Sequence, residues 1–131
     1  MDSISIFIDG GCKNNGTSNA EAYGSMAVCF KGEVKRTERW AFRNALTNNE
    51  AEYGALMSAF NYLLAEPKRM SYPVVIRTDS QLVWGQCTQG WKVKAENLRK
   101  RNQAAQDFLA KHKNVTIKKV GRDEVVKVLG H

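Results

Sequence analysis

Three acidic residues stand at positions in the sequence that a purely structural role explains poorly. Asp9 directly follows the alternating segment SISIFI, and Asp79 follows the apolar segment PVVIRT. Glu52 lies beside Ala51 and Ala55, on what would be the core-facing side of a helix. An Asp after a strand is often only a turn former, but three carboxylates brought together repel one another and need cations to neutralise them. Oxygen ligands without His or Cys favour Mg²⁺ or Mn²⁺ over zinc.

The acids meet only if the elements that carry them are neighbours. Isoleucines at every second position predict a strand over residues 3–9, which we expect to end at the acid because Gly10 and Gly11 interrupt the pattern. If this strand lies beside the one that ends at Asp79, the two carboxylates come side by side at one edge of the sheet. A helix that packs across this edge would add Glu52.

The rest of the chain predicts further strands and helices without a linker or repeat. Apolar residues at helical spacing predict a helix over residues 49–66, with Thr47 or Asn48 as its N-cap and Pro67 at its end. Strands are expected at 22–30, 32–42, 73–79 and 114–120, and helices from Ser80 and over 95–111. The first three strands form an antiparallel meander. This order predicts one α/β domain over residues 1–131, with helices packed on a mixed sheet.

Charge and composition narrow the class of protein. Twenty Lys and Arg against 13 Asp and Glu give a net charge of +7, so the protein either binds a polyanion or carries an ordinary lysine-rich face. Cys12, Cys29 and Cys87 fit neither a disulfide framework nor a paired zinc site, and we expect reduced thiols. With no long apolar run and no signal-peptide pattern, we expect a soluble, cytoplasmic protein. Ten of the basic residues lie between positions 92 and 122: Lys92, Lys94, Arg99, Lys100, Arg101, Lys111, Lys113, Lys118, Lys119 and Arg122.

Four segments in this order and spacing resemble ribonuclease H of type 1, most closely its short prokaryotic and archaeal branch without a basic handle. They are FIDGGCKNNG (7–16), TNNEAEYGAL (47–56), RTDSQLVWGQ (77–86) and WKVKAENLRKR (91–101). The resemblance implies a ribonuclease H-like fold with a mixed five-stranded sheet, three antiparallel strands followed by parallel ones, and helices on both faces. It also implies that Asp9, Glu52 and Asp79 are catalytic and hold the metal, as two Mg²⁺ or Mn²⁺ ions.

The same resemblance implies which residues contact the substrate, an RNA/DNA hybrid. Those for the RNA strand are Gly11, Cys12, Asn15, Asn48, Asn49 and Gln81. Between Asp79 and the basic helix, aromatic residues and cations interleave in a way that suits the DNA strand of a hybrid; they are Trp84, Trp91, Lys92 and Lys94. Simpler roles stay open for several of them. Asn48 would cap a helix equally well, Gln81 could be a solvated side chain, and the alternative for Cys12 and for Trp91 is a place in the core.

The C-terminal segment departs from the family pattern. The family carries Arg-Glu-x-Asn-x-x-Ala-Asp after the last strand, and its final Asp is a fourth metal ligand. Aligning Arg122 with that Arg puts Leu129 at the place of the Asp. We therefore expect a short or missing C-terminal helix, and Asp123, Glu124 or His131 as substitutes for the fourth ligand. Alternatively, these residues only cap or follow the helix.

Three hypotheses on function follow. The first is an endonuclease that hydrolyses the RNA strand of hybrids to 5′-phosphate and 3′-hydroxyl ends. Of two metal ions about 4 Å apart, one would activate water and the other would stabilise the leaving oxygen. Such an enzyme is expected to be a monomer, and no protein partner is indicated. The second is a catalytically weak hybrid-binding module, because the fourth acid is missing. The third is a related nuclease for another nucleic acid, because a fold does not fix a substrate.

Overall fold

A five-stranded mixed sheet organises the computed structural model, which describes residues 2–130. The strand order is β3-β2-β1-β4-β5. β1 pairs antiparallel with β2 and parallel with β4, β2 pairs antiparallel with β3, and β4 pairs parallel with β5. The predicted meander and the predicted mixed sheet are therefore confirmed. The strands are β1 (Ile4–Lys13), β2 (Glu21–Phe30), β3 (Glu33–Phe42), β4 (Val74–Thr78) and β5 (Val115–Lys119).

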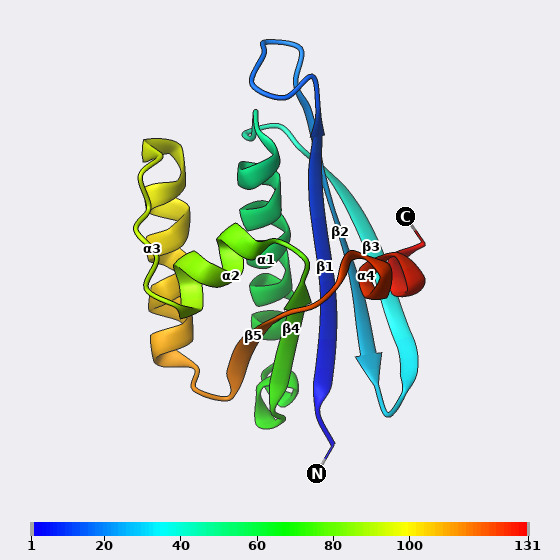
Figure 1. Cartoon of the computed structure of the whole chain (residues 1–131). Coiled ribbons are helices and arrows are strands. Elements are labelled where there is room, and N and C mark those ends of the chain that lie inside the picture. The colour runs from blue at the N-terminus through cyan, green and yellow to red at the C-terminus, as the bar shows by residue number, and fades with distance from the viewer. Residues whose placement is uncertain (1, 131) are drawn as a thin grey trace.

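Helices cover both faces of the sheet, as expected. Figure 1 shows α1, α2 and α3 together on one side and α4 alone on the other. α1 contacts β1 and β2 and separates the sheet from α3, while α4 contacts β1 and β2 from the opposite face. The helices are α1 (Asn48–Ala65), the 3-10 helix η1 (Pro67–Ser71), α2 (Gln81–Thr88), α3 (Glu96–Lys111) and α4 (Arg122–Leu129).

The main core lies between β1, β4 and α1. Ile6 and Ile76 face α1 from the sheet, and Leu56 and Leu63 face them from the helix, all fully buried. Each such side chain contributes about 1.5–3 kcal/mol by leaving water. α1 is buried around most of its circumference because it packs against both the sheet and α3. The helix that carries Glu52 is thus held firmly in place.

The prediction that the first strand ends at Asp9 is wrong. β1 continues through Gly10 and Gly11 to Lys13 and stays paired with β2. The two glycines serve close packing instead of breaking the strand. A Cβ at Gly10 would collide with the backbone of Ala51 in α1, and one at Gly11 would collide with the ring of Tyr23. Asp9 therefore lies within a strand, next to the glycine at which that strand comes closest to the N-terminal part of α1.

The cysteines and the helices bear on two expectations drawn from composition. All three cysteines carry free thiols, and Cys87 is buried. Across residues 2–130, none of the helices has the length and apolar character needed to cross a membrane.

Candidate metal-dependent active site

The parallel pairing of β1 with β4 brings Asp9 and Asp79 together. The paired register ends at Ile8 and Thr78, and in each strand the next residue is the acid. Just after Asp79 the chain turns into α2, where the Ser80 hydroxyl accepts a hydrogen bond from the Val83 N–H and caps the helix. This abrupt change from strand to helix leaves Asp79 at the end of the sheet, beside Asp9.

The first turns of α1 add the third acid. The helix begins after Thr47, whose hydroxyl accepts a hydrogen bond from Glu50 N–H, so the expected cap is confirmed. Because Gly10 lets β1 approach α1 closely, the Gly10 N–H donates directly to Oε1 of Glu52. One ligand oxygen from each of Asp9, Glu52 and Asp79 lies within 4.8 Å of the others. The expected acid cluster is formed.

Burial and mutual repulsion change the ionisation of Glu52. Desolvation, and after it the charge of Asp9, raise the pKa of the Glu52 carboxyl from 4.5 to about 8, against the opposing effects of the Gly10 hydrogen bond and of Arg122. In the absence of a cation, the cluster therefore favours a proton on Glu52 near neutral pH. A bound divalent ion supplies the opposite charge that the ionised triad needs, and the set of carboxylate oxygens fits Mg²⁺ or Mn²⁺.

Arg122 also belongs to the site, although the sequence did not predict this role for it. Its Nη1 donates to Oδ1 of Asp9 and to Oδ2 of Asp79, each at 3.0 Å. These two contacts raise the pKa of the Arg122 guanidinium. The available signal was its alignment with the first residue of the family's C-terminal motif. We call Asp9, Glu52 and Asp79 the acid triad, and Arg122 is its cationic neighbour.

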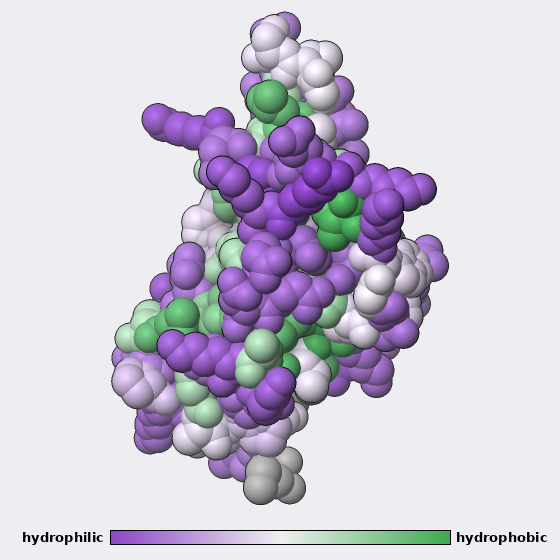
Figure 2. Space-filling view, turned by 90° about the vertical axis from the view of Figure 1, so that its left-hand side faces the viewer, coloured by the Kyte–Doolittle hydropathy of each residue, from purple (hydrophilic) through white to green (hydrophobic). Residues whose placement is uncertain are grey.

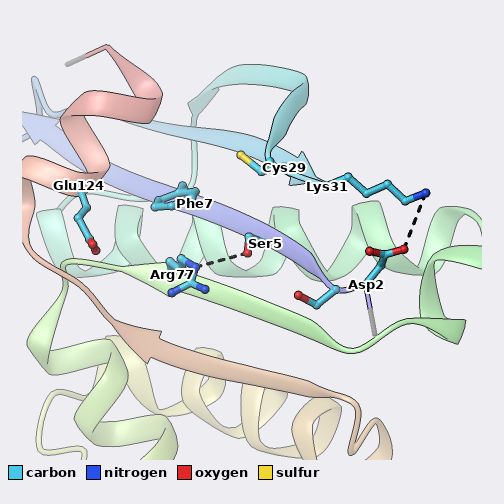
Figure 3. Close-up of a pocket in the computed structure, with 9 residues that line it drawn as sticks. Asp2, Ser5, Phe7, Cys29, Lys31, Arg77 and Glu124 are labelled. Atoms are coloured by element: carbon cyan, nitrogen blue, oxygen red, sulfur yellow. Dashed lines mark hydrogen bonds and ion pairs between the residues drawn. The ribbon is translucent and has the colours of Figure 1, made fainter.

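The substitutes suggested for the fourth ligand lie elsewhere or outside the described residues. Asp123 and Glu124 are exposed in the first turn of α4, and among residues 2–130 neither joins the acid triad. Figure 3 shows Glu124 with Phe7 and Arg77 at a cavity of about 510 Å³ on the α4 side of the sheet. His131 lies outside the described residues. α4 has eight residues and is therefore short, as expected.

Several residues expected at the RNA strand connect β1 to the start of α1. The Cys12 N–H donates to Oδ1 of Asn48 at 2.7 Å, and the Asn48 N–H donates to Oδ1 of Asn15 at 2.7 Å. Gly11 is buried against Tyr23, whereas Asn49 and Gln81 are exposed at the first turns of α1 and α2. The structure thus gives Asn15 and Asn48 a positioning role and leaves Asn49 and Gln81 accessible. Their contacts with substrate remain a prediction.

The residues expected at the DNA strand lie in α2 and between α2 and α3. Trp91 packs on Gly85, contacts the ring of Trp84 edge-on, and stays 43% exposed. Lys92 and Lys94 are exposed, and Arg99 donates to the carbonyls of Val93 and Lys94, which holds this segment against α3. Figure 2 views the side of the molecule where α3 lies, and hydrophilic side chains cover most of it. The exposed cations Lys92 and Lys94 suit contact with a phosphate backbone.

Comparison with known proteins agrees with the fold and the site. The family model described as RNase H matches residues 1–131. A ribonuclease H of Clostridium botulinum is 35% identical over 103 residues, which are 78% of this chain and 62% of the relative, so the chain spans less than two thirds of that protein.

Solved structures of type 1 enzymes are also similar. RNase H1 of the archaeon Halobacterium salinarum is 25% identical with a TM-score of 0.80, covering 96% of this chain and 91% of the other. LC11-RNase H1, solved in complex with an RNA/DNA hybrid, is 23% identical with a TM-score of 0.81, covering 95% and 90%. This chain therefore belongs to the ribonuclease H family, with type 1 enzymes as its structural neighbours.

Proposed function

We propose that this protein is an endoribonuclease that hydrolyses the RNA strand of RNA/DNA hybrids with the help of divalent metal ions. The observation that carries the proposal is the acid triad, whose three carboxylates converge from β1, α1 and the end of β4. A solvated surface role would not require Glu52 to be buried beside two other acids. The family membership supports the same reaction.

In this proposal Asp9, Glu52 and Asp79 hold Mg²⁺ or Mn²⁺, as two ions. When bound, the ions would activate the attacking water and stabilise the charge that develops on the leaving 3′ oxygen. The protein's part is to keep the three carboxylates fixed. Gly10 does so directly, because its N–H holds Oε1 of Glu52 in place while its missing side chain lets α1 approach. The products would carry 5′-phosphate and 3′-hydroxyl ends.

Substrate selection is proposed to rest on exposed groups around the triad. Asn49 and Gln81 lie in the first turns of the two helices next to the acids and offer amide groups to 2′-hydroxyls, which distinguish RNA from DNA. Trp91, Lys92 and Lys94 offer a partly exposed indole ring and two cations to the other strand. LC11-RNase H1, which has the same fold, was solved in complex with an RNA/DNA hybrid, and this supports a hybrid as the class of substrate.

A cleavage assay tests the proposal. Equal concentrations of hybrid, duplex RNA and duplex DNA are incubated with the protein in Mg²⁺, Mn²⁺ or chelator, and the product ends are identified. We expect hybrid cleavage that needs metal, and a loss of at least about 100-fold in Asp9→Asn and Asp79→Asn variants that still fold. Preferential cleavage of duplex RNA or DNA would indicate the related nuclease instead.

A second candidate, a hybrid-binding module with little catalysis, is favoured by the residue at the fourth ligand's place. Leu129 offers no ligand atom, and it lines a hollow with Ser25 and Arg39 at the end of α4. Such a module would bind hybrid with the same salt sensitivity as the enzyme but release no product in either metal. The assay above, with a binding measurement beside it, separates the two candidates.

A further inference from the structure

Arg122 occupies the space between two of the three acids from the solvent side. One nitrogen atom, Nη1, contacts Oδ1 of Asp9 and Oδ2 of Asp79, both at 3.0 Å. The acids are largely covered, with side chains 4% and 16% exposed, whereas the arginine side chain is 54% exposed. A single cation thus bridges carboxylates that come from two different strands.

The fold brings Arg122 to this place through fixed backbone contacts. The Val120 N–H donates to the Thr78 carbonyl at 2.9 Å, which ties the segment before α4 to the end of β4. Val125, one turn into α4, is fully buried and fixes the helix on the sheet. The start of α4 is therefore adjacent to Asp79, and the Arg122 side chain has only to turn toward the acids.

Electrostatics favour placing the Arg122 guanidinium beside Asp9 and Asp79 instead of at the N-terminus of its own helix. Arg122 is the first residue of α4, where the helix dipole is positive and disfavours a cation. Asp123 and Glu124, in the same turn, have the charge that suits that position. The two carboxylates therefore supply the electrostatic attraction that keeps the guanidinium where it is.

A divalent ion held by the triad would bind Oδ atoms that Arg122 already contacts. Both cations are attracted by the same carboxylates, and within a few ångströms of each other they repel. We propose that Arg122 is the resident counter-cation of the acid triad, which a divalent ion must displace, so that this residue sets the metal affinity of the site. The inference rests on the proposed metal-dependent function, and it concerns what limits the binding of metal to the acid triad.

Metal titration of the full chain tests the inference without any substrate. Calorimetry measures Mn²⁺ binding to the metal-free protein at constant ionic strength, for the natural chain and for Arg122→Gln and Arg122→Lys. Removing the charge should tighten Mn²⁺ binding by about tenfold, which corresponds to about 1.4 kcal/mol. Arg122→Lys keeps the charge and should stay within about threefold of the natural chain. Without metal, Arg122→Gln should unfold at a lower temperature, because the ion pairs of Arg122 with Asp9 and Asp79 are lost.

Arg36→Gln is the matched control. Arg36 is 52% exposed and paired with Glu38 at 3.1 Å on β3, so its removal changes the net charge equally but leaves the triad untouched. Unchanged or weaker Mn²⁺ binding in Arg122→Gln, or equal tightening in Arg36→Gln, overturns the inference. If the natural chain binds Mn²⁺ and cleaves hybrid, the proposed function survives that result. If no variant binds Mn²⁺, both the inference and the metal-dependent function fail.

Discussion

Glu52 is the residue whose surroundings alter its chemistry most. Its carboxyl is buried beside Asp9, and its pKa of about 8 means that the folded, metal-free protein holds a proton that the unfolded chain, with a value near 4.5, releases. Between these two values the folded state binds more protons than the unfolded state. Stability must therefore fall as pH rises through this window.

We expect the metal-free protein to lose about 2–4 kcal/mol of unfolding free energy relative to Glu52→Gln between pH 5 and pH 8. The amide has the shape of the protonated acid and does not titrate. Urea unfolding in chelator, at several pH values, measures the difference. Glu21→Gln, at an exposed position on β2, is the control and should follow the natural chain. Parallel pH curves for the natural chain and Glu52→Gln would show that burial does not hold the proton on Glu52.

The exposed amides beside the triad carry a second prediction at the residue scale. Replacing both Asn49 and Gln81 by Ala should slow hybrid cleavage by about tenfold or more, since each is expected to bond a 2′-hydroxyl. Thermal unfolding should hardly change, because both side chains are exposed at helix starts. The double variant Asn61→Ala, Gln103→Ala removes an exposed Asn and Gln from sites far along α1 and from α3, and should leave cleavage unchanged. Equal rates for both double variants would exclude the assignment.

At the scale of elements, the sequence predicts the site better than it predicts the boundaries around it. The acids could be grouped because alternating and helical patterns locate β1, β4 and α1, and parallel strands bring their ends together. The continuation of β1 through Gly10 could not be predicted, since it depends on contact with Ala51, far along the chain. The role of Arg122 also escaped prediction, because a basic residue in a lysine-rich region carries no local mark of a distant ion pair.

The short helix α4 leads to a prediction about the missing acid. Leu129 lines a hollow with Ser25, which pairs with Asp9 across β1 and β2. An acid at position 129 would thus be placed on the Asp9 side of the sheet by a helix that already forms. Leu129→Asp should lower the Mg²⁺ concentration needed for half-maximal cleavage by several-fold, because a further carboxylate strengthens a hard-ion site.

Val126→Asp provides the control for this change. Val126 lies on the same helix, one turn after Arg122, and is 38% exposed, so an acid there adds the same charge at a position in contact with solvent. Its Mg²⁺ requirement should match that of the natural chain. Initial cleavage rates against Mg²⁺ for the three proteins compare them directly. If Leu129→Asp and Val126→Asp behave alike, the end of α4 takes no part in metal binding.

At the scale of the whole molecule, the distribution of charge separates two tasks. In the proposed function, the net charge of +7 would attract a nucleic acid, whereas the acid triad is a small negative site within that field. Exposed cations between α2 and α3, and on α3 itself, would give an approaching duplex a broad surface of favourable potential. Attraction at long range and metal binding at short range are thus assigned to different residues, and each can be changed without the other.

Salt dependence measures the first of these tasks. If Lys92 and Lys94 each neutralise one phosphate, replacing both by Gln should reduce the slope of log affinity against log salt by about 2, because each contact releases about one counterion. Hybrid binding is measured in chelator, where cleavage cannot interfere. The control double variant Lys35→Gln, Lys68→Gln removes the same charge from exposed positions on β3 and η1. This control should leave the slope nearly unchanged. Equal slopes for the two double variants would mean that binding depends on net charge alone and that no defined surface contacts the DNA strand.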